Sequence, residues 1–173
     1  MADTALGARI LKVNHAGENG AVHIYAGQIA IARWTAPHMV VQLRDFCAHE
    51  QTHRTIFAAE LQRRQRPRCR SYWLCGAGGY VLGVVTALFG RHAIAATTVA
   101  VEHVVLRHLQ QQLQDLRGMD EQATCAIEKI IADEQHHHDH SAHHLQGARF
   151  WPAVLTPVVA ASTEAVIWLG MKL

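Results

Sequence analysis

Two Glu-x-x-His motifs stand out among the residues of this chain that could do chemistry. Glu50 and His53 form the first motif, and Glu134 and His137 form the second. On a helix, residues three apart project from neighbouring positions on one face, so the carboxylate and the imidazole of each motif can bind one cation. A single such motif is weak support for a metal site, because a chain with 14 histidines contains such pairs by chance.

The spacing of the motifs makes them specific, because two further glutamates repeat with them. The interval from the first glutamate to the motif is 32 residues in both halves, and the second set follows the first by 84 residues. The three equivalent pairs are Glu18 and Glu102, Glu50 and Glu134, and His53 and His137. We interpret this pattern as an internal repeat of a helical hairpin, over about residues 10–65 and about 92–146.

Two such hairpins packed together would place four carboxylates and two imidazoles in the middle of one bundle. This is the ligand set of ferritin-like proteins that bind two iron or two manganese ions. Glu50 and Glu134 are expected to bridge the ions, because their helices also carry the histidines, and Glu18 and Glu102 are expected as terminal ligands. Four buried carboxylates repel one another unless cations neutralise them, so the ions would also stabilise the core.

Other polar residues lie near the motifs without fitting the repeat. Tyr25 follows Glu18 by two turns, and we interpret it as a donor or substrate contact near that carboxylate, or otherwise as a core residue. Three aspartates could orient ligand imidazoles, or could be solvated or cap helices: Asp45, Asp133 and Asp139. Four histidines are expected at the surface or behind the ligands: His15, His49, His103 and His108.

The elements that position these residues are predicted to be helices. Strand signals are scarce, and Ala, Leu, Gln, Arg and His recur at helical spacing. The expected helices cover about residues 16–34, 38–65, 72–116 with a weak break at Gly90, 120–146, and a last stretch ending at 173. The sequence therefore predicts an all-α, ferritin-like antiparallel four-helix bundle with an additional C-terminal helix, as a single domain over residues 1–173.

Charge and hydrophobicity are distributed unevenly. The formal net charge is only +2, which gives no field for a nucleic-acid partner. Five arginines nevertheless lie within residues 63–70, and the charge-free segment Leu74–Gly90 follows them. This segment could span a membrane, could be a bundle helix whose glycines allow close packing, or could lie in a membrane interface with the arginines near lipid phosphates. The order of basic and apolar residues slightly favours the interface.

Several segments of the chain resemble the demethoxyubiquinone hydroxylase family of ubiquinone biosynthesis. The similarity extends from about residue 10 to the C-terminus, and its clearest stretches are residues 13–18, 24–28, 82–90, 99–102, and 133–139. The resemblance implies that two Fe ions form the catalytic centre. Their ligands would be the same six residues, namely Glu18, Glu50, His53, Glu102, Glu134 and His137.

The resemblance also implies an activity and a place of work. It implies a di-iron monooxygenase that uses O2 to hydroxylate the ring of a demethoxyubiquinone-type polyprenyl quinone at a membrane surface. The chain has no glycine-rich nucleotide loop, so we expect an external reductant such as NADH. Because the N-terminus lacks an organelle presequence, we expect a peripheral protein on the cytoplasmic face of a bacterial inner membrane. Partner proteins of ubiquinone biosynthesis and a homo-oligomer both stay open.

Two departures from the family and one alternative function accompany this resemblance. Many relatives have glutamate where this chain has His103, and aspartate where it has Asn14. Neither position is an expected ligand, so the departures bear on local proton delivery rather than on metal binding. The six ligands alone also fit a ferritin-like protein that oxidises and handles iron, but that function does not explain the segment Leu74–Gly90.

Overall fold

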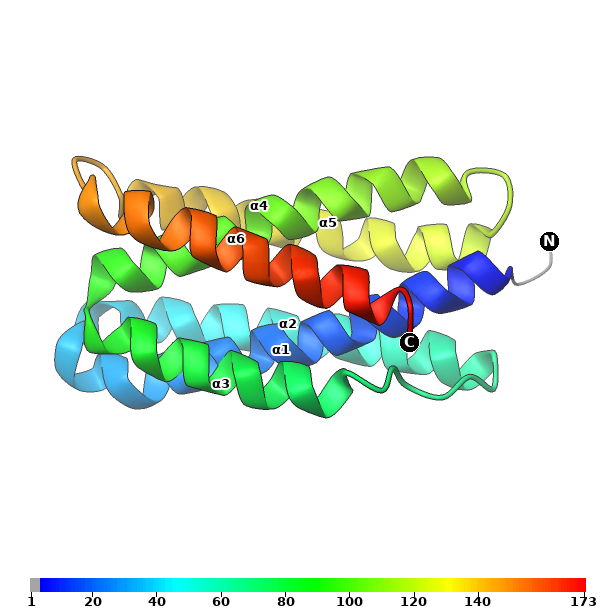
Figure 1. Cartoon of the computed structure of the whole chain (residues 1–173), viewed down its shortest axis with the longest axis horizontal. Coiled ribbons are helices and arrows are strands. Elements are labelled where there is room, and N and C mark those ends of the chain that lie inside the picture. The colour runs from blue at the N-terminus through cyan, green and yellow to red at the C-terminus, as the bar shows by residue number, and fades with distance from the viewer. Residues whose placement is uncertain (1–3) are drawn as a thin grey trace.

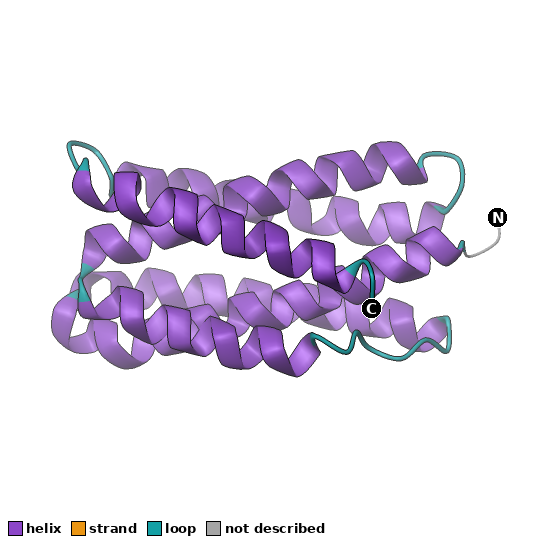
Figure 2. Cartoon of the chain, viewed as in Figure 1, coloured by secondary structure: helices purple, strands orange, loops and turns teal. Residues whose placement is uncertain are grey.

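The structure is a computed structural model that describes residues 4–173, and every regular element in that part of the chain is helical (Figures 1 and 2). A short 3-10 helix at Pro37–Met39 joins the first two of its α-helices. The α-helices are α1 (Ala5–Thr35), α2 (Val40–Arg63), α3 (Tyr72–Leu88), α4 (Arg91–Leu116), α5 (Glu121–His143) and α6 (Phe150–Gly170). The all-α prediction is confirmed, and the first three residues of the domain predicted over 1–173 lie outside the described part.

Helices α1, α2, α4 and α5 form an antiparallel bundle of two hairpins, and α3 and α6 lie outside it (Figure 1). The four bundle helices share a core whose fully buried side chains include Leu11, Phe57, Leu116 and Ile127. Helix α3 packs on α1, and α6 packs on α4. The C-terminal helix is therefore an outer helix, as predicted, but it is one of two.

Two predicted helix bounds are wrong. The helix predicted over residues 72–116 is divided into α3 and α4 at Gly90, whose φ of 79° lies in the left-handed region that ends a helix. The first helix begins at Ala5 instead of near residue 16, because the Thr4 hydroxyl accepts a hydrogen bond from the Gly7 N–H at 2.8 Å and caps the helix there. The division at Gly90 is what places α3 outside the bundle.

Glycines bring α3 unusually close to α1. A Cβ atom added at Gly79 would overlap the backbone carbonyl of Gly20, and one added at Gly83 would overlap the carbonyl of Ile24. The same holds in the other direction, because a Cβ atom at Gly27 would overlap backbone atoms of α3. Only glycine allows this approach, so these residues fix the distance between the two helices.

The segment Leu74–Gly90 is neither fully buried nor fully exposed. Its glycine face packs on α1, while large apolar side chains on the other face, such as Trp73 and Val81, are more than half exposed. Helix α6 exposes similar residues, including Val158 and Trp168. By length and composition α6 is the one described helix that could cross a membrane, although soluble proteins also contain such helices.

The arginine cluster is smaller than its sequence indicates. The side chain of Arg64 is 1% exposed and donates two hydrogen bonds of 2.7 Å to the carboxylate of Asp120. Arg63 pairs with Glu60. The prediction that all five arginines face lipid phosphates is therefore wrong for Arg64, because its charge is needed to neutralise a buried carboxylate that also caps α5. The other exposed members are Arg66, Arg68 and Arg70.

We expect Gly83→Ala to lower the free energy of unfolding by about 1–3 kcal/mol, because the added methyl group would force α3 away from α1. Thermal unfolding followed by circular dichroism measures this. Gly78→Ala on the same helix is the matched control, because its added methyl group would meet no atom within 4 Å. Equal melting temperatures for the two variants would contradict this account of the interface.

Candidate metal centre

The six predicted ligand residues lie together in the middle of the bundle. Each bundle helix contributes one carboxylate, and α2 and α5 each add an imidazole one turn later. All six side chains are buried, with at most 5% of any residue exposed. They are Glu18 on α1, Glu50 and His53 on α2, Glu102 on α4, and Glu134 and His137 on α5.

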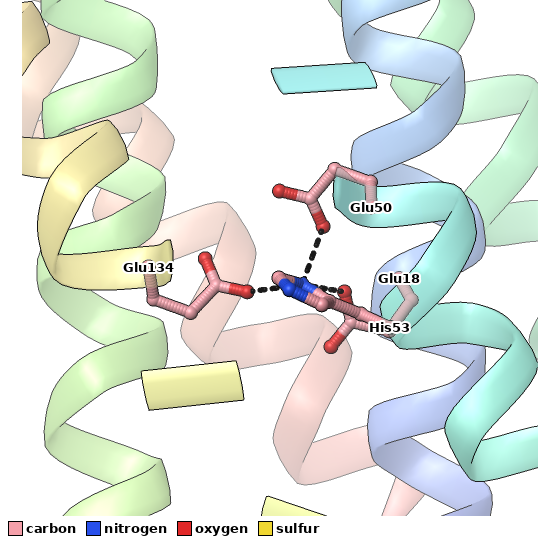
Figure 3. Close-up of side chains that lie close together, drawn as sticks. All are labelled: Glu18, Glu50, His53 and Glu134. Carbon is pink, nitrogen blue, oxygen red and sulfur yellow. Dashed lines mark ion pairs between the residues drawn. The ribbon is translucent and has the colours of Figure 1, made fainter. Parts of the chain in front are cut away.

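The first half of the cluster surrounds His53 (Figure 3). Its Nδ1 atom lies 3.0 Å from Oε1 of Glu134, 3.7 Å from Oε2 of Glu50 and 3.8 Å from Oε2 of Glu18. One ligand atom from each of these four residues lies within 4.8 Å of the others. This spacing suits one cation.

The second half surrounds His137 and shares two carboxylates with the first. The Nδ1 atom of His137 lies 3.1 Å from Oε1 of Glu50 and 3.7 Å from Oε2 of Glu134, and Glu102 completes the group. Glu50 and Glu134 thus each present one oxygen to each imidazole. A carboxylate in this position can bridge two cations.

The donor atoms lack other partners, which is what a metal centre requires. Both carboxylate oxygens of Glu50, Oε2 of Glu134 and the Nδ1 atoms of His53 and His137 are buried without a partner in hydrogen-bond geometry in the described part of the chain. Buried polar atoms without partners are costly. Oxygen and imidazole donors in this number could hold two divalent transition-metal ions.

Protons compensate the buried charge when no cation is bound. Burial raises the pKa values of Glu18 and Glu102 well above the usual carboxyl range, and neighbouring carboxylates add to this. Burial opposes protonation of the two imidazoles, but the surrounding carboxylates outweigh it: they raise the pKa of His137 to about 9 and that of His53 further. A cation entering the cluster must therefore displace protons.

The outer nitrogen of each imidazole has a partner from the opposite hairpin. Nε2 of His53 lies 3.0 Å from Oδ2 of Asp133, which agrees with one of the roles predicted for this aspartate. Nε2 of His137 lies 3.1 Å from Nδ1 of His49, which therefore lies behind a ligand and contacts it. Sequence reasoning grouped His49 with three other histidines and missed this contact, although residue 49 directly precedes Glu50 as residue 133 precedes the second motif.

Other predicted residues are less central. The hydroxyl of Tyr25 donates a hydrogen bond of 3.0 Å to Oε1 of Glu102, so it contacts a carboxylate of the second half rather than Glu18, its neighbour on α1. Burial and this carboxylate raise the pKa of the tyrosine. Two of the aspartates and one histidine are exposed at the surface: Asp45, Asp139 and His103.

A cavity of about 470 Å³ leads from the cluster to the outer helices. All four carboxylates line it, and neither His53 nor His137 does. Its walls are small or apolar residues of α1, α3, α4 and α6, among them Gly78, Leu82, Val101, Val105 and Ile167. The cavity therefore joins the carboxylate side of the cluster to the two helices that expose apolar side chains.

Comparison with known proteins gives one consistent family. A protein of Dictyostelium discoideum named "NADPH-dependent 3-demethoxyubiquinone 3-hydroxylase, mitochondrial" is 33% identical over 170 residues, which cover 95% of this chain and 76% of the relative. The "3-demethoxyubiquinol 3-hydroxylase" of Rhodospirillum rubrum is 33% identical over 171 residues, covering 97% and 79%. A human protein with the same name as the Dictyostelium one is 34% identical over 172 residues, covering 95% and 77%.

The family comparison extends over the whole fold. The sequence model of the ubiquinone biosynthesis protein COQ7 family matches residues 5–170, from the start of α1 to the end of α6. The resemblance noted in the sequence is therefore confirmed, and the chain belongs to the COQ7 family of ubiquinone biosynthesis proteins.

Proposed function

We propose that this protein is a di-iron monooxygenase that uses O2 to hydroxylate the ring of a demethoxyubiquinone-type polyprenyl quinone. One observation carries the proposal: an apolar cavity runs from the outer helices to the four carboxylates of a buried cluster that can hold two ions. The names of the relatives, which are hydroxylases of demethoxyubiquinone or demethoxyubiquinol, agree with it.

The six residues divide the binding of two iron ions between them. Glu18 and His53 would hold one ion, Glu102 and His137 the other, and Glu50 and Glu134 would bridge both. Iron bound in this way supplies the activation of O2 that ring hydroxylation requires. The protein contributes the spacing of the donors and surroundings with little water.

The cavity suits an apolar substrate with one reactive end. Its inner end is formed by the carboxylates of the cluster, and its outer walls by side chains such as Leu82 and Val105. A quinone ring would lie against the cluster, and the prenyl tail would extend along the glycine-rich α3 toward the exposed apolar side chains. Apolar walls exclude water from the reacting ring.

The cavity also argues against the alternative of an iron-handling protein. Iron storage requires that hydrated ions reach the cluster, whereas the walls of this cavity are mostly apolar. Electrons would come from an external reductant, and the names of several relatives indicate NADPH.

We further propose that the exposed faces of α3 and α6 contact the surface of a membrane, on the cytoplasmic side of a bacterial inner membrane. Trp73, Val81, Val158 and Trp168 are each at least 60% exposed on these two outer helices. Both helices also wall the cavity, so a lipid-soluble quinone could enter from the bilayer without crossing water.

The proposed activity predicts a specific pair of variant phenotypes. We expect the iron-loaded protein, given a short-tailed demethoxyubiquinol analogue, reductant and O2, to form a product heavier by one oxygen atom, detected by mass spectrometry. Glu134→Ala should abolish both iron binding and product, because it removes a bridging carboxylate. Gly78→Leu should keep the iron and lower turnover at least about tenfold, because its side chain would project into the cavity.

Val85→Leu on the exposed face of α3 is the control for Gly78→Leu, since it adds bulk outside the cavity. Iron uptake without any hydroxylated product in the unmodified protein would overturn the proposed activity. Full turnover by Glu134→Ala would overturn the assignment of the ligands.

We expect metal affinity to rise with pH. Glu18, Glu102, His53 and His137 hold protons in the metal-free protein, and cations must displace them. If one proton leaves for each ion, affinity increases about tenfold per pH unit between about pH 6 and about pH 8. Anaerobic titration with Co²⁺ at several pH values measures this slope, and an affinity that does not change with pH would contradict the proton-compensated cluster.

We expect the double variant Val81→Glu and Val158→Glu to lose most of its binding to phospholipid vesicles, because it places a charge on the apolar face of each outer helix. Co-sedimentation measures the bound fraction. Val41→Glu is the matched control, since Val41 is 70% exposed on α2, away from both outer helices. Equal binding by the double variant and the unmodified protein would exclude these faces as the contact surface.

A further inference from the structure

The two imidazoles of the cluster are held in the same way but by different chemical groups. In both, Nδ1 faces the carboxylates and Nε2 points away from them. The Nε2 atom of His53 lies 3.0 Å from a carboxylate oxygen of Asp133, whereas that of His137 lies 3.1 Å from an imidazole nitrogen of His49. If Nδ1 binds a cation, Nε2 carries the proton and donates it to these partners.

Asp133 and His49 occupy one position of the inferred repeat. They are 84 residues apart, the same interval that separates the paired ligands, and each directly precedes a glutamate of the cluster. Each contacts the imidazole of the other hairpin, so the partners are exchanged across the bundle. The geometry is thus conserved between the halves while the acceptor changes from a carboxylate to a neutral ring.

A second difference affects the same half. The Tyr25 hydroxyl donates to Oε1 of Glu102 at 3.0 Å. The residue 84 positions after Tyr25 is Leu109, which has no hydroxyl to offer to Glu18. A hydrogen bond from a hydroxyl withdraws charge from the carboxylate that accepts it, so Glu102 is left a weaker donor toward a cation than Glu18.

The two differences act in one direction. A carboxylate that accepts the outer N–H of a ligand imidazole makes that ring a stronger donor to the metal, and removing such a partner typically costs about 10–100-fold in affinity. Asp133 gives this support to His53, whereas the ring of His49 gives less to His137. The half that lacks a carboxylate behind its imidazole is also the half whose Glu102 is hydrogen-bonded by Tyr25.

We propose that the two metal positions are unequal, because Asp133 and His49 are positioning residues of different strength. The ion held by Glu18 and His53 is bound more tightly, and the ion held by Glu102 and His137 binds second and leaves first. This inference rests on the metal centre proposed above.

Anaerobic titration of the metal-free, full-length protein with Co²⁺, followed by visible absorption and calorimetry, tests the inequality. We expect two binding steps whose affinities differ at least about tenfold. Asp133→Asn should weaken the first step about tenfold or more and leave the second in place. His49→Asp should strengthen the second step and bring the two together, and Mössbauer spectra of the iron-loaded variant should show two more similar iron environments.

Asp139→Asn is the matched control, because Asp139 lies on the same helix as Asp133 but is exposed and bonds only to Gln135 and His138. Two equal steps in the unmodified protein, or an Asp133→Asn variant that weakens only the second step, would overturn the inference. If His49→Asp does not fold, His49→Ala tests the same point, because it should weaken only the second step. Binding of fewer than two ions would instead refute the metal centre itself.

Discussion

The burial of four carboxylates and two imidazoles at one point is the constraint on which the rest of this structure depends. Ionised groups without water are costly, so the cluster is tolerated only if protons or cations neutralise it. Compensation requires that donors from four helices converge to within a few ångströms. The two hairpins must therefore pack in one register, and a shift by a single turn would leave carboxylates such as Glu18 and Glu102 facing apolar neighbours.

Helix α1 links this constraint to the cavity, because it serves both sides. Glu18 faces the cluster, while Gly20 and Gly27 on the same helix let α3 approach at backbone distance. The position of α3 is thus fixed by the helix that carries a ligand. A cavity wall built on α3, as at Gly78, keeps its distance from the carboxylates for the same reason.

The sequence predicts the cluster better than it predicts the path of the chain. The spacing of 84 residues identifies all six residues that the structure brings together, because a repeat of chemistry-bearing residues is rare in unrelated sequence. The break at Gly90 was underestimated, since a glycine inside a helical pattern does not reveal that its φ is positive. The burial of Arg64 depends on Asp120, 56 residues away, and the contact of His49 depends on the opposite hairpin. Such pairings are set by tertiary packing, which local patterns do not contain.

The cluster has two sides with different tasks. The carboxylates line the cavity, so any substrate in it meets the oxygen donors. The imidazoles point the other way, and their outer nitrogens are held by Asp133 and His49, which are both partly exposed between α2 and α5. Access for an apolar molecule and control of the ligand rings are therefore separated by the plane of the cluster. Substitutions on the imidazole side can change how the ions are held without altering the walls of the cavity, and this separation lets the two halves of a repeated site diverge in strength while one substrate path serves both.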